Sequence, residues 1–359
     1  MGGGTSGKIL VALMGAAVLA ACASSQGQGF PGTPAKAIGP MGAVLPAQPP
    51  AAPLAAPVAA STTIPTPPPV PGPTVDSDSD SRPPPPPPAY LAPGVHDHQM
   101  QIDAYTRRWS TVVPPRADGT LPTGLVVVLH GVGGRGSDMR STGFEPLAVA
   151  AGSVVVYPDA VGGAWNDGRP GADPVVPGVD DVRFLRLLIE EAAARTGADP
   201  RRVAIVGFSN GAVMAGRVAC ELADRVAAVA VVGGTAGQGF EQSCRPARPV
   251  AMMVVAGSND RTVPYAGGRV ADWGARRRGF VAPVDDFFAF WRAQAGCAST
   301  QPVPALPQVS ATRGTDCRAE AAVVRYRVNG GGHEWFRPPG LDTTNVVWDF
   351  VTRRFATAA

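Results

Sequence analysis

Short, continuous apolar runs alternate with longer amphipathic stretches from about residue 98 onward. Runs of this kind, ended by Gly, Pro or Asn, are typical of strands that are buried on both faces of a parallel sheet. We predict such strands at residues 124–130, 153–157, 202–206 and 249–256. A first strand near 104–113 and the apolar run 322–328 extend the pattern.

Between the runs, apolar residues recur at helical spacing. The segment 180–196 shows this with Val182, Leu185, Leu188, Ile189 and Ala192. Segments 210–223 and 343–355 are predicted as further helices, and another should end near Ala295. The alternation predicts an α/β domain over residues 97–359, with a mostly parallel sheet and helices on both faces.

The chain before this domain has a different composition. Residues 23–96 hold 21 of the 39 prolines and few large apolar side chains. Such a segment cannot bury enough apolar surface to offset the entropy lost on ordering. We expect a disordered, extended spacer there. A proline-rich ligand for a partner domain is the weaker alternative.

Residues 1–22 have the features of a bacterial signal peptide. Lys8 precedes the apolar run 9–21, which is too short to span a bilayer comfortably. The run ends in Leu-Ala-Ala-Cys, which resembles a lipobox, so we expect a lipid on Cys22 that anchors the protein to a membrane. An ordinary secretory signal with an incidental cysteine is the alternative.

Charge and histidine spacing argue against two classes of partner. The net charge is only +3, and no basic run is interleaved with aromatic residues, so nucleic acid is not expected to bind. His96 and His98 lack further Cys or His residues at metal-ligand spacing, so no metal is expected.

Four cysteines follow Cys22: Cys220, Cys244, Cys297 and Cys317. An even number in an exported chain predicts disulfides, with three possible connectivities. We favour Cys220 with Cys244 and Cys297 with Cys317, because each pair brackets a local excursion from the sheet. The segment 298–316 is rich in Pro, Ser and Thr without a clear period, and we expect it to be a loop.

The string Gly207-Phe208-Ser209-Asn210-Gly211 lies directly between a predicted strand and a predicted helix. That context is the one in which G-x-S-x-G forms a nucleophile elbow, a sharp turn that exposes the serine oxygen. A glycine-rich turn without catalytic function is the alternative. We take Ser209 as the candidate nucleophile.

A serine nucleophile needs a general base and a carboxylate that orients the base. His333 is the only histidine after Ser209, and it follows the apolar run 322–328. Asp260 follows the predicted strand 249–256 and is our candidate for the carboxylate. The competing residues are Asp272, Asp285 and Asp286, whose contexts are more typical of helix caps. The order Ser, Asp, His is that of α/β-hydrolases.

A glycine-rich loop after the first buried strand, His130-Gly131-Val132-Gly133-Gly134, offers backbone N–H groups. By the logic of this fold, the N–H groups of Val132 and Asn210 would form the oxyanion hole. We interpret His130 as structural, because a side chain at the strand end is better placed to orient the loop than to reach the serine.

In combination, these motifs resemble polyhydroxybutyrate depolymerase-like esterases, which are related to the feruloyl and acetylxylan esterases of carbohydrate esterase family 1. Besides the elbow and the His130 loop, the resemblance rests on residues 157–159, 163–169, 259–265 and 331–335. It spans nearly all of residues 100–355. Ala164 and Arg261 depart from the usual pattern, in which glycine and proline are common at these places.

The resemblance implies the α/β-hydrolase fold and a serine esterase that needs no cofactor. Trp165 and Trp335 flank the predicted site, where an aromatic face would hold a sugar or feruloyl ring; packing within their loops is an equal alternative. Polyesters, acylated polysaccharides and small soluble esters all suit the predicted site. A serine peptidase of the same fold and a surface-displayed binding protein without turnover are the rival functions.

Overall fold

The computed structural model describes residues 90–116, 120–174, 176–272, 274–318 and 321–357. The expected signal peptide, Cys22 and the proline-rich segment as far as residue 89 lie outside these ranges. All described residues belong to the unit Ser81–Ala359. None of the helices in these ranges combines the length and the hydropathy that crossing a bilayer requires.

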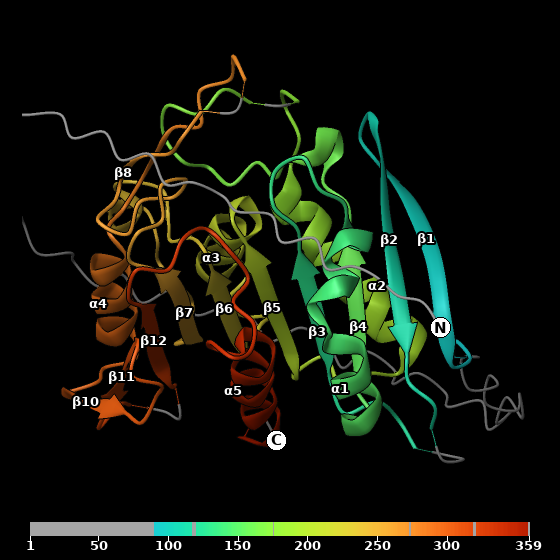
Figure 1. The fold of residues 1–359 in the computed structure, drawn as a ribbon. Helices are drawn as coiled ribbons and strands as arrows, with labels where there is room; N and C mark the ends of the chain where they lie inside the picture. Colours follow the sequence, from blue (N-terminus) through green and yellow to red (C-terminus); the bar gives the residue numbers. More distant parts are fainter. Residues whose placement is uncertain (1–89, 117–119, 175, 273, 319–320, 358–359) are drawn as a thin grey trace, which may run out of the picture. The chain divides into compact units, whose positions relative to one another are not determined.

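A ten-stranded sheet in the order β1-β2-β4-β3-β5-β6-β7-β12-β11-β10 runs through the unit (Figure 1). Its parallel centre comprises β4 (Val154–Pro158), β3 (Leu125–Leu129), β5 (Val203–Phe208), β6 (Ala228–Val232), β7 (Ala251–Gly257) and β12 (Val323–Val328). Antiparallel hairpins form the edges: β1 (Gly94–Ile102) with β2 (Tyr105–Val113), and β10 (Ser299–Val303) with β11 (Val309–Thr315). The predicted mostly parallel sheet is therefore confirmed.

Helices cover both faces of this sheet. They are α1 (Phe144–Ala151), α2 (Asp181–Thr196), α3 (Asn210–Glu221), α4 (Val284–Gln294) and α5 (Thr343–Thr357). Leu125, Val127 and Leu129 of β3 belong to the hydrophobic cluster that includes residues of α2, α3 and α4, whereas Val126 and Val128 belong to the cluster that includes residues of α1 and α5. Figure 1 shows α1 and α5 in front of the sheet and α2 behind it. Because both faces are covered, β3, β4, β6 and β7 are buried throughout, which explains the continuous apolar runs, whereas β12 carries two arginines and is only partly buried.

Short elements complete the unit. They are the 3-10 turns η1 (Gly136–Thr142), η2 (Val161–Gly163) and η3 (Phe240–Gln242), and the two-stranded ribbon β8 (Gly268–Arg269) with β9 (Phe280–Val281).

We predicted a loop for the segment 298–316, and this prediction is wrong. The segment forms the hairpin β10–β11 at the sheet edge. Its residues are mostly exposed or half-buried, so the apolar alternation that marks a strand is weak. Pro302 lies within β10 and lowers the strand signal, yet proline is tolerated on an edge strand because no neighbour needs its missing N–H.

Three more elements were not predicted. The strand β1 begins at Gly94, before the expected domain boundary at residue 97, and its residues alternate between exposed and half-buried. The strand β6 is fully buried but contains two alanines, which favour strands weakly. The helix α1 has only eight residues, too few to establish a helical period.

Both favoured cysteine pairings are confirmed, since disulfides join Cys220 to Cys244 and Cys297 to Cys317. The second bond closes the open end of the edge hairpin, where Ser299 pairs with Thr315. The first links the end of α3 to the segment after η3.

Candidate active site

Ser209 occupies a sharp turn between β5 and α3. Its φ of 57° and ψ of −118° are unusual for a residue with a side chain. The Ser209 N–H donates to the carbonyl of Val232, 3.0 Å away, which fixes the turn against β6. A side chain at Gly207 would overlap the carbonyl of Gly211, so the turn requires glycine at that position. The sequence thus forms an elbow of the kind that lifts a serine oxygen clear of the sheet.

The loops that carry Asp260 and His333 follow neighbouring parallel strands, β7 and β12, and bond to each other. The N–H of Ser258 donates to Val328 and that of Asn259 to Gly331, each over 2.9 Å. A side chain at Gly257 would overlap the carbonyls of Gly331 and Gly332. Glycine at this position therefore allows the two loops to approach each other closely.

The three predicted side chains form one hydrogen-bonded chain. Nε2 of His333 lies 2.9 Å from Oγ of Ser209, and Nδ1 lies 2.7 Å from Oδ2 of Asp260. The Asp260 residue is 6 % exposed. Its Oδ1 accepts the N–H groups of Thr262 and Val263, 2.8 Å each, so both oxygens are satisfied. A carboxylate at Nδ1 places the imidazole proton there and leaves Nε2 to accept the serine proton.

The rival carboxylates lie elsewhere. Asp272 pairs with Arg269, and Asp285 accepts from Tyr265 and Arg325. Asp286 lies in the first turn of α4, together with Asp285. In the part of the chain that the structure describes, His333 has no carboxylate partner other than Asp260.

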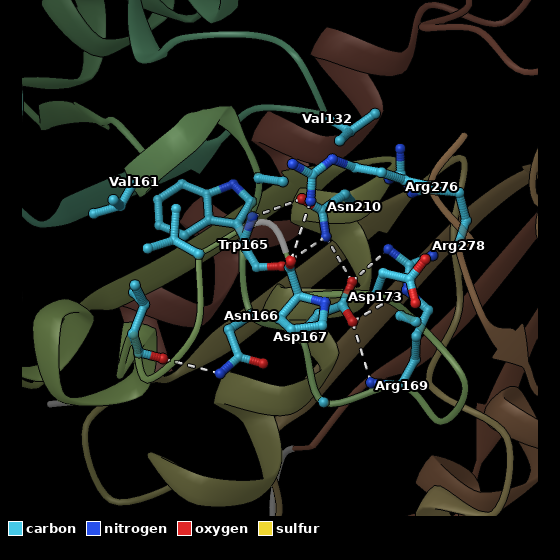
Figure 2. Close-up of a pocket in the computed structure, with 16 residues that line it drawn as sticks. Val132, Val161, Trp165, Asn166, Asp167, Arg169, Asp173, Asn210, Arg276 and Arg278 are labelled. Atoms are coloured by element: carbon cyan, nitrogen blue, oxygen red, sulfur yellow. Dashed lines mark hydrogen bonds and ion pairs between the residues drawn. The ribbon is translucent and has the colours of Figure 1, made fainter. Parts of the chain in front are cut away.

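Val132 and Asn210 line one small cavity with Trp165 (Figure 2). The Asn210 side chain is also important: its Oδ1 accepts the N–H of Trp165 at 2.7 Å, and its Nδ2 donates to the Trp165 carbonyl and to Asp167. This side chain therefore ties the elbow to the loop that bears Trp165. The sequence did not reveal this second role of Asn210.

Both tryptophans pack within the protein. Trp165 is only 4 % exposed, and its indole N–H donates to the carbonyl of His130. Trp335 is half-buried, donates to Oγ1 of Thr344 and meets the rings of Phe144 and Phe208 edge-on. These contacts favour the packing alternative for both residues, although Trp165 also forms part of the cavity wall.

His130 is buried and lies against the Trp165 ring, with the ring centres 5.2 Å apart. Its Nδ1 lies 2.7 Å from the carbonyl of Gly131, and its Nε2 accepts the N–H of Ala160. Burial lowers the pKa of His130, which favours the neutral ring that these partners require. The side chain joins two loops of the site and does not contact Ser209 by a hydrogen bond.

A buried polar network supports the Trp165 loop from below. Arg107 of β2 donates to Asp181, and the other oxygen of Asp181 accepts the N–H of Asn166 at 2.6 Å. Asp167 pairs with Arg169, and both are buried. No local spacing in the sequence indicated the long-range partners of residues 166 and 167.

Among the residues that the structure describes, no three His, Cys, Asp or Glu side chains gather to hold an ion. His96 and His98 lie on β1, where the His98 ring stacks on Trp109.

The sheet order, the elbow after β5 and the helices on both faces define the α/β-hydrolase class. No family model matches the chain. It is 28% identical over 234 residues to feruloyl esterase B of Piromyces equi, covering 63% of this chain and 41% of that protein. It is 30% identical over 262 residues to the putative esterase NocK of Nocardia uniformis subsp. tsuyamanensis, covering 67% of this chain and 75% of that protein. The chain belongs to this family of carboxylic ester hydrolases.

Among solved structures, an acetyl xylan esterase from Aspergillus awamori superimposes with a TM-score of 0.49 at 16% identity. The superposition covers 70% of this chain and 98% of that one.

Proposed function

We propose that the protein hydrolyses carboxylic esters through an acyl-enzyme on Ser209. The observation that carries this proposal is the position of His333, within hydrogen-bond reach of both Ser209 and the buried carboxylate of Asp260. Ser209 Oγ attacks the ester carbonyl while its proton passes to Nε2 of His333. The same proton then leaves with the alcohol. Water attacks the acyl group in the second half, which releases the acid and restores Ser209.

The developing oxyanion needs donors beside Ser209. We assign these to the backbone N–H groups of Val132 and Asn210, one from the loop after β3 and one from the first residue of α3. The partial positive charge at the start of α3 acts in the same direction. The buried Asn210 side chain is already bonded to Trp165 and Asp167, so it holds this region rigid.

We propose acetyl or feruloyl esters of polysaccharides as the substrates, because the names of two relatives point to them. One relative is named a feruloyl esterase, and another is named a bifunctional acetylxylan esterase/xylanase. Polyhydroxyalkanoate-type polyesters are the alternative. A hydrolysis panel of acetylated xylan, feruloylated oligosaccharide, polyester oligomers and a peptide substrate separates these, and cleavage of the peptide alone would favour a serine peptidase.

Replacing Ser209 tests the mechanism. Ser209→Ala should lower kcat on a para-nitrophenyl ester by roughly a millionfold, as removal of a triad nucleophile does. A fluorophosphonate probe should label the wild-type protein and not the variant. The circular dichroism spectrum is the control for folding. A variant that retains more than about one per cent of the rate, or a wild-type protein that resists labelling, would refute the assignment.

We further propose that the protein is exported and held at a membrane by a lipid on Cys22. Two disulfides in the folded unit support an oxidising compartment. Mass spectrometry of the exported protein should find a diacylglycerol on Cys22. A free thiol there, or a mature chain that starts at another residue, would contradict the anchor.

A further inference from the structure

The cavity beside Val132 and Asn210 has a volume of about 90 Å³. Pockets that hold whole drug-sized ligands measure roughly 300–1,000 Å³, so this cavity suits one small group of a substrate. Figure 2 shows Trp165 and Val161 on one side of it and Arg169, Arg276 and Arg278 on the other.

The two carboxylates in the cavity wall are already neutralised. Oδ2 of Asp167 accepts from the Arg169 guanidinium and from the Asn210 amide, each over 2.6 Å. Asp173 is bound by Arg277: Oδ1 accepts from the guanidinium and Oδ2 from the backbone N–H, both at 2.9 Å. The direct ion-pair partners of these two carboxylates are therefore Arg169 and Arg277, not Arg276 or Arg278.

Three arginines line the cavity: Arg169, Arg276 and Arg278. Within the described residues, Arg169 forms an ion pair with a carboxylate, and Arg276 and Arg278 form none. Arg276 donates to the carbonyl of Pro174 over 3.2 Å. No hydrogen bond or ion pair of the Arg278 side chain exists within the described ranges, although this residue is half-buried. Burial, followed by the nearby charge of Arg169, lowers the pKa of Arg278, and the more weakly acting charges of Asp167 and Asp272 oppose this shift. The guanidinium stays protonated, as it does in proteins generally. An anion in the cavity would relieve this unfavourable burial.

The backbone fixes the position of these arginines. The segment that bears them pairs with residues 170–173: Ala172 bridges to Arg278, and the N–H of Asp173 donates to the carbonyl of Arg277 at 3.0 Å. The N–H of Phe280 donates to Pro170, also at 3.0 Å. Both cations are therefore presented to the cavity by a hydrogen-bonded ribbon.

We propose that this cavity binds a carboxylate carried by the ester substrate, with Arg278 and Arg276 as its partners. The planar guanidinium matches a carboxylate with two parallel hydrogen bonds, which a neutral group cannot accept with the same strength. The proposal rests on the proposed ester hydrolysis, since it assigns a specificity to that same site. It predicts that an ester carrying a carboxylate is hydrolysed with a higher kcat/KM than a neutral ester of the same shape.

Matched substrates test the preference. The mono-para-nitrophenyl ester of glutarate carries a carboxylate on the acyl part, and its isosteric control replaces that carboxylate with an isopropyl group. A second pair, para-acetoxybenzoate and para-isopropylphenyl acetate, carries the difference on the alcohol part. In the wild-type enzyme, kcat/KM should favour the anionic member of at least one pair by about tenfold or more, and the pair that responds shows which part of the ester enters the cavity.

Variants connect this preference to the two arginines. Arg278→Gln should lower kcat/KM of the preferred anionic ester about tenfold, which corresponds to about 1.4 kcal/mol, and should change its neutral partner less than twofold. Arg276→Gln, at an exposed position, should act in the same direction. Arg201→Gln is the matched control: it removes one charge at an exposed turn before β5, outside the cavity wall, and should change neither ester.

The outcomes separate the two proposals. If the wild-type enzyme hydrolyses both members of each pair equally, or if Arg278→Gln and Arg276→Gln leave the preference unchanged, the anion site is refuted and the esterase stands. An equal loss on anionic and neutral esters in both variants would also refute it, because it would indicate a structural role. If no ester is hydrolysed and the fluorophosphonate probe does not react, the proposed function fails first.

Discussion

The conformation of Ser209 costs a residue with a side chain roughly 1–3 kcal/mol. Such strain persists only where neighbours fix the backbone, and at Ser209 they do. Its N–H bonds to β6, its carbonyl accepts the N–H groups of Ala212 and Val213 at the start of α3, and Gly207 leaves room for the tight turn. In this conformation Oγ lies 2.9 Å from Nε2 of His333, which is the geometry that the proposed acyl transfer needs.

Asp260 should contribute through the orientation of His333. In Asp260→Asn the amide keeps the shape of the side chain, but its NH₂ group can face Nδ1 and favour the wrong imidazole tautomer. We expect kcat to fall by on the order of 10⁴ with the fold intact. Steady-state kinetics on a para-nitrophenyl ester would measure this.

The matched controls for that experiment are Asp272→Asn and Asp285→Asn, which break ion pairs with Arg269 and with the half-buried Arg325. Both carboxylates are exposed and neither contacts His333, so both variants should remain close to wild-type activity. If either control loses more activity than Asp260→Asn, Asp260 is not the orienting carboxylate.

At the residue scale, the sequence indicated the residues that follow directly from a strand end. Ser209 and Asp260 come shortly after the buried strands β5 and β7, and His333 follows the partly buried β12. Parallel strands place their carboxyl ends at the same edge. The cations of the cavity could not be found in this way. Arg278 lies in the sequence between the short strands β8 and β9. It reaches the cavity because residues 277–280 pair with residues 170–173.

At the scale of elements, most strands covered on both faces were predictable, β6 excepted, and the edges of the sheet were not. Burial on both faces makes a strand such as β3 or β7 apolar throughout, which is a strong local signal. The edge strands β1 and β10 are half solvated, and their residues give only weak alternation. Their place in the fold depends on pairing with β2 and β11, which adjacent residues do not encode.

The hairpin β10–β11 should depend on its disulfide. A bond that closes a loop of about twenty residues stabilises by about 3 kcal/mol, in a model whose entropic basis is disputed. Cys297→Ala with Cys317→Ala should therefore lower the thermal unfolding midpoint by several degrees. Initial rates at 25 °C should change little, because β12, which leads to His333, also pairs along its length with β7.

Differential scanning calorimetry and peptide mapping under non-reducing conditions would check this. The double variant Cys220→Ala with Cys244→Ala is the comparison, since its disulfide has a similar sequence separation, 24 residues, and joins α3 to the segment after η3 instead of the edge hairpin. An unchanged midpoint, or free thiols at Cys297 and Cys317 in the exported wild-type protein, would contradict the role of the bond.

At the scale of the whole molecule, the contacts that position the candidate site, as far as the described residues show them, lie within the unit Ser81–Ala359. The serine, the histidine and the carboxylate follow β5, β12 and β7, and the two hydrophobic clusters that support these strands lie within residues 102–355. The unit also includes residues just before β1. The N–H of Leu91 donates to Arg195 of α2 at 2.8 Å, and Arg116 donates to the Leu91 carbonyl.

These contacts predict where the chain can be shortened. A chain that begins at Ser81 keeps Leu91 and the whole of β1, so its kcat/KM on a soluble ester and its unfolding midpoint should equal those of the full chain.

A chain that begins at Asp97 loses the Leu91 contacts and the first three residues of β1. It should unfold at a lower temperature, since each 1 kcal/mol lost shifts the midpoint by roughly 2–4 °C in a domain of this size. Its rate at 25 °C should persist, because β1 lies at the sheet edge that is farthest from β7 and β12. Equal midpoints for the two chains would show that the folded domain begins at residue 97, and a loss of activity in the longer one would show that residues before Ser81 take part in catalysis.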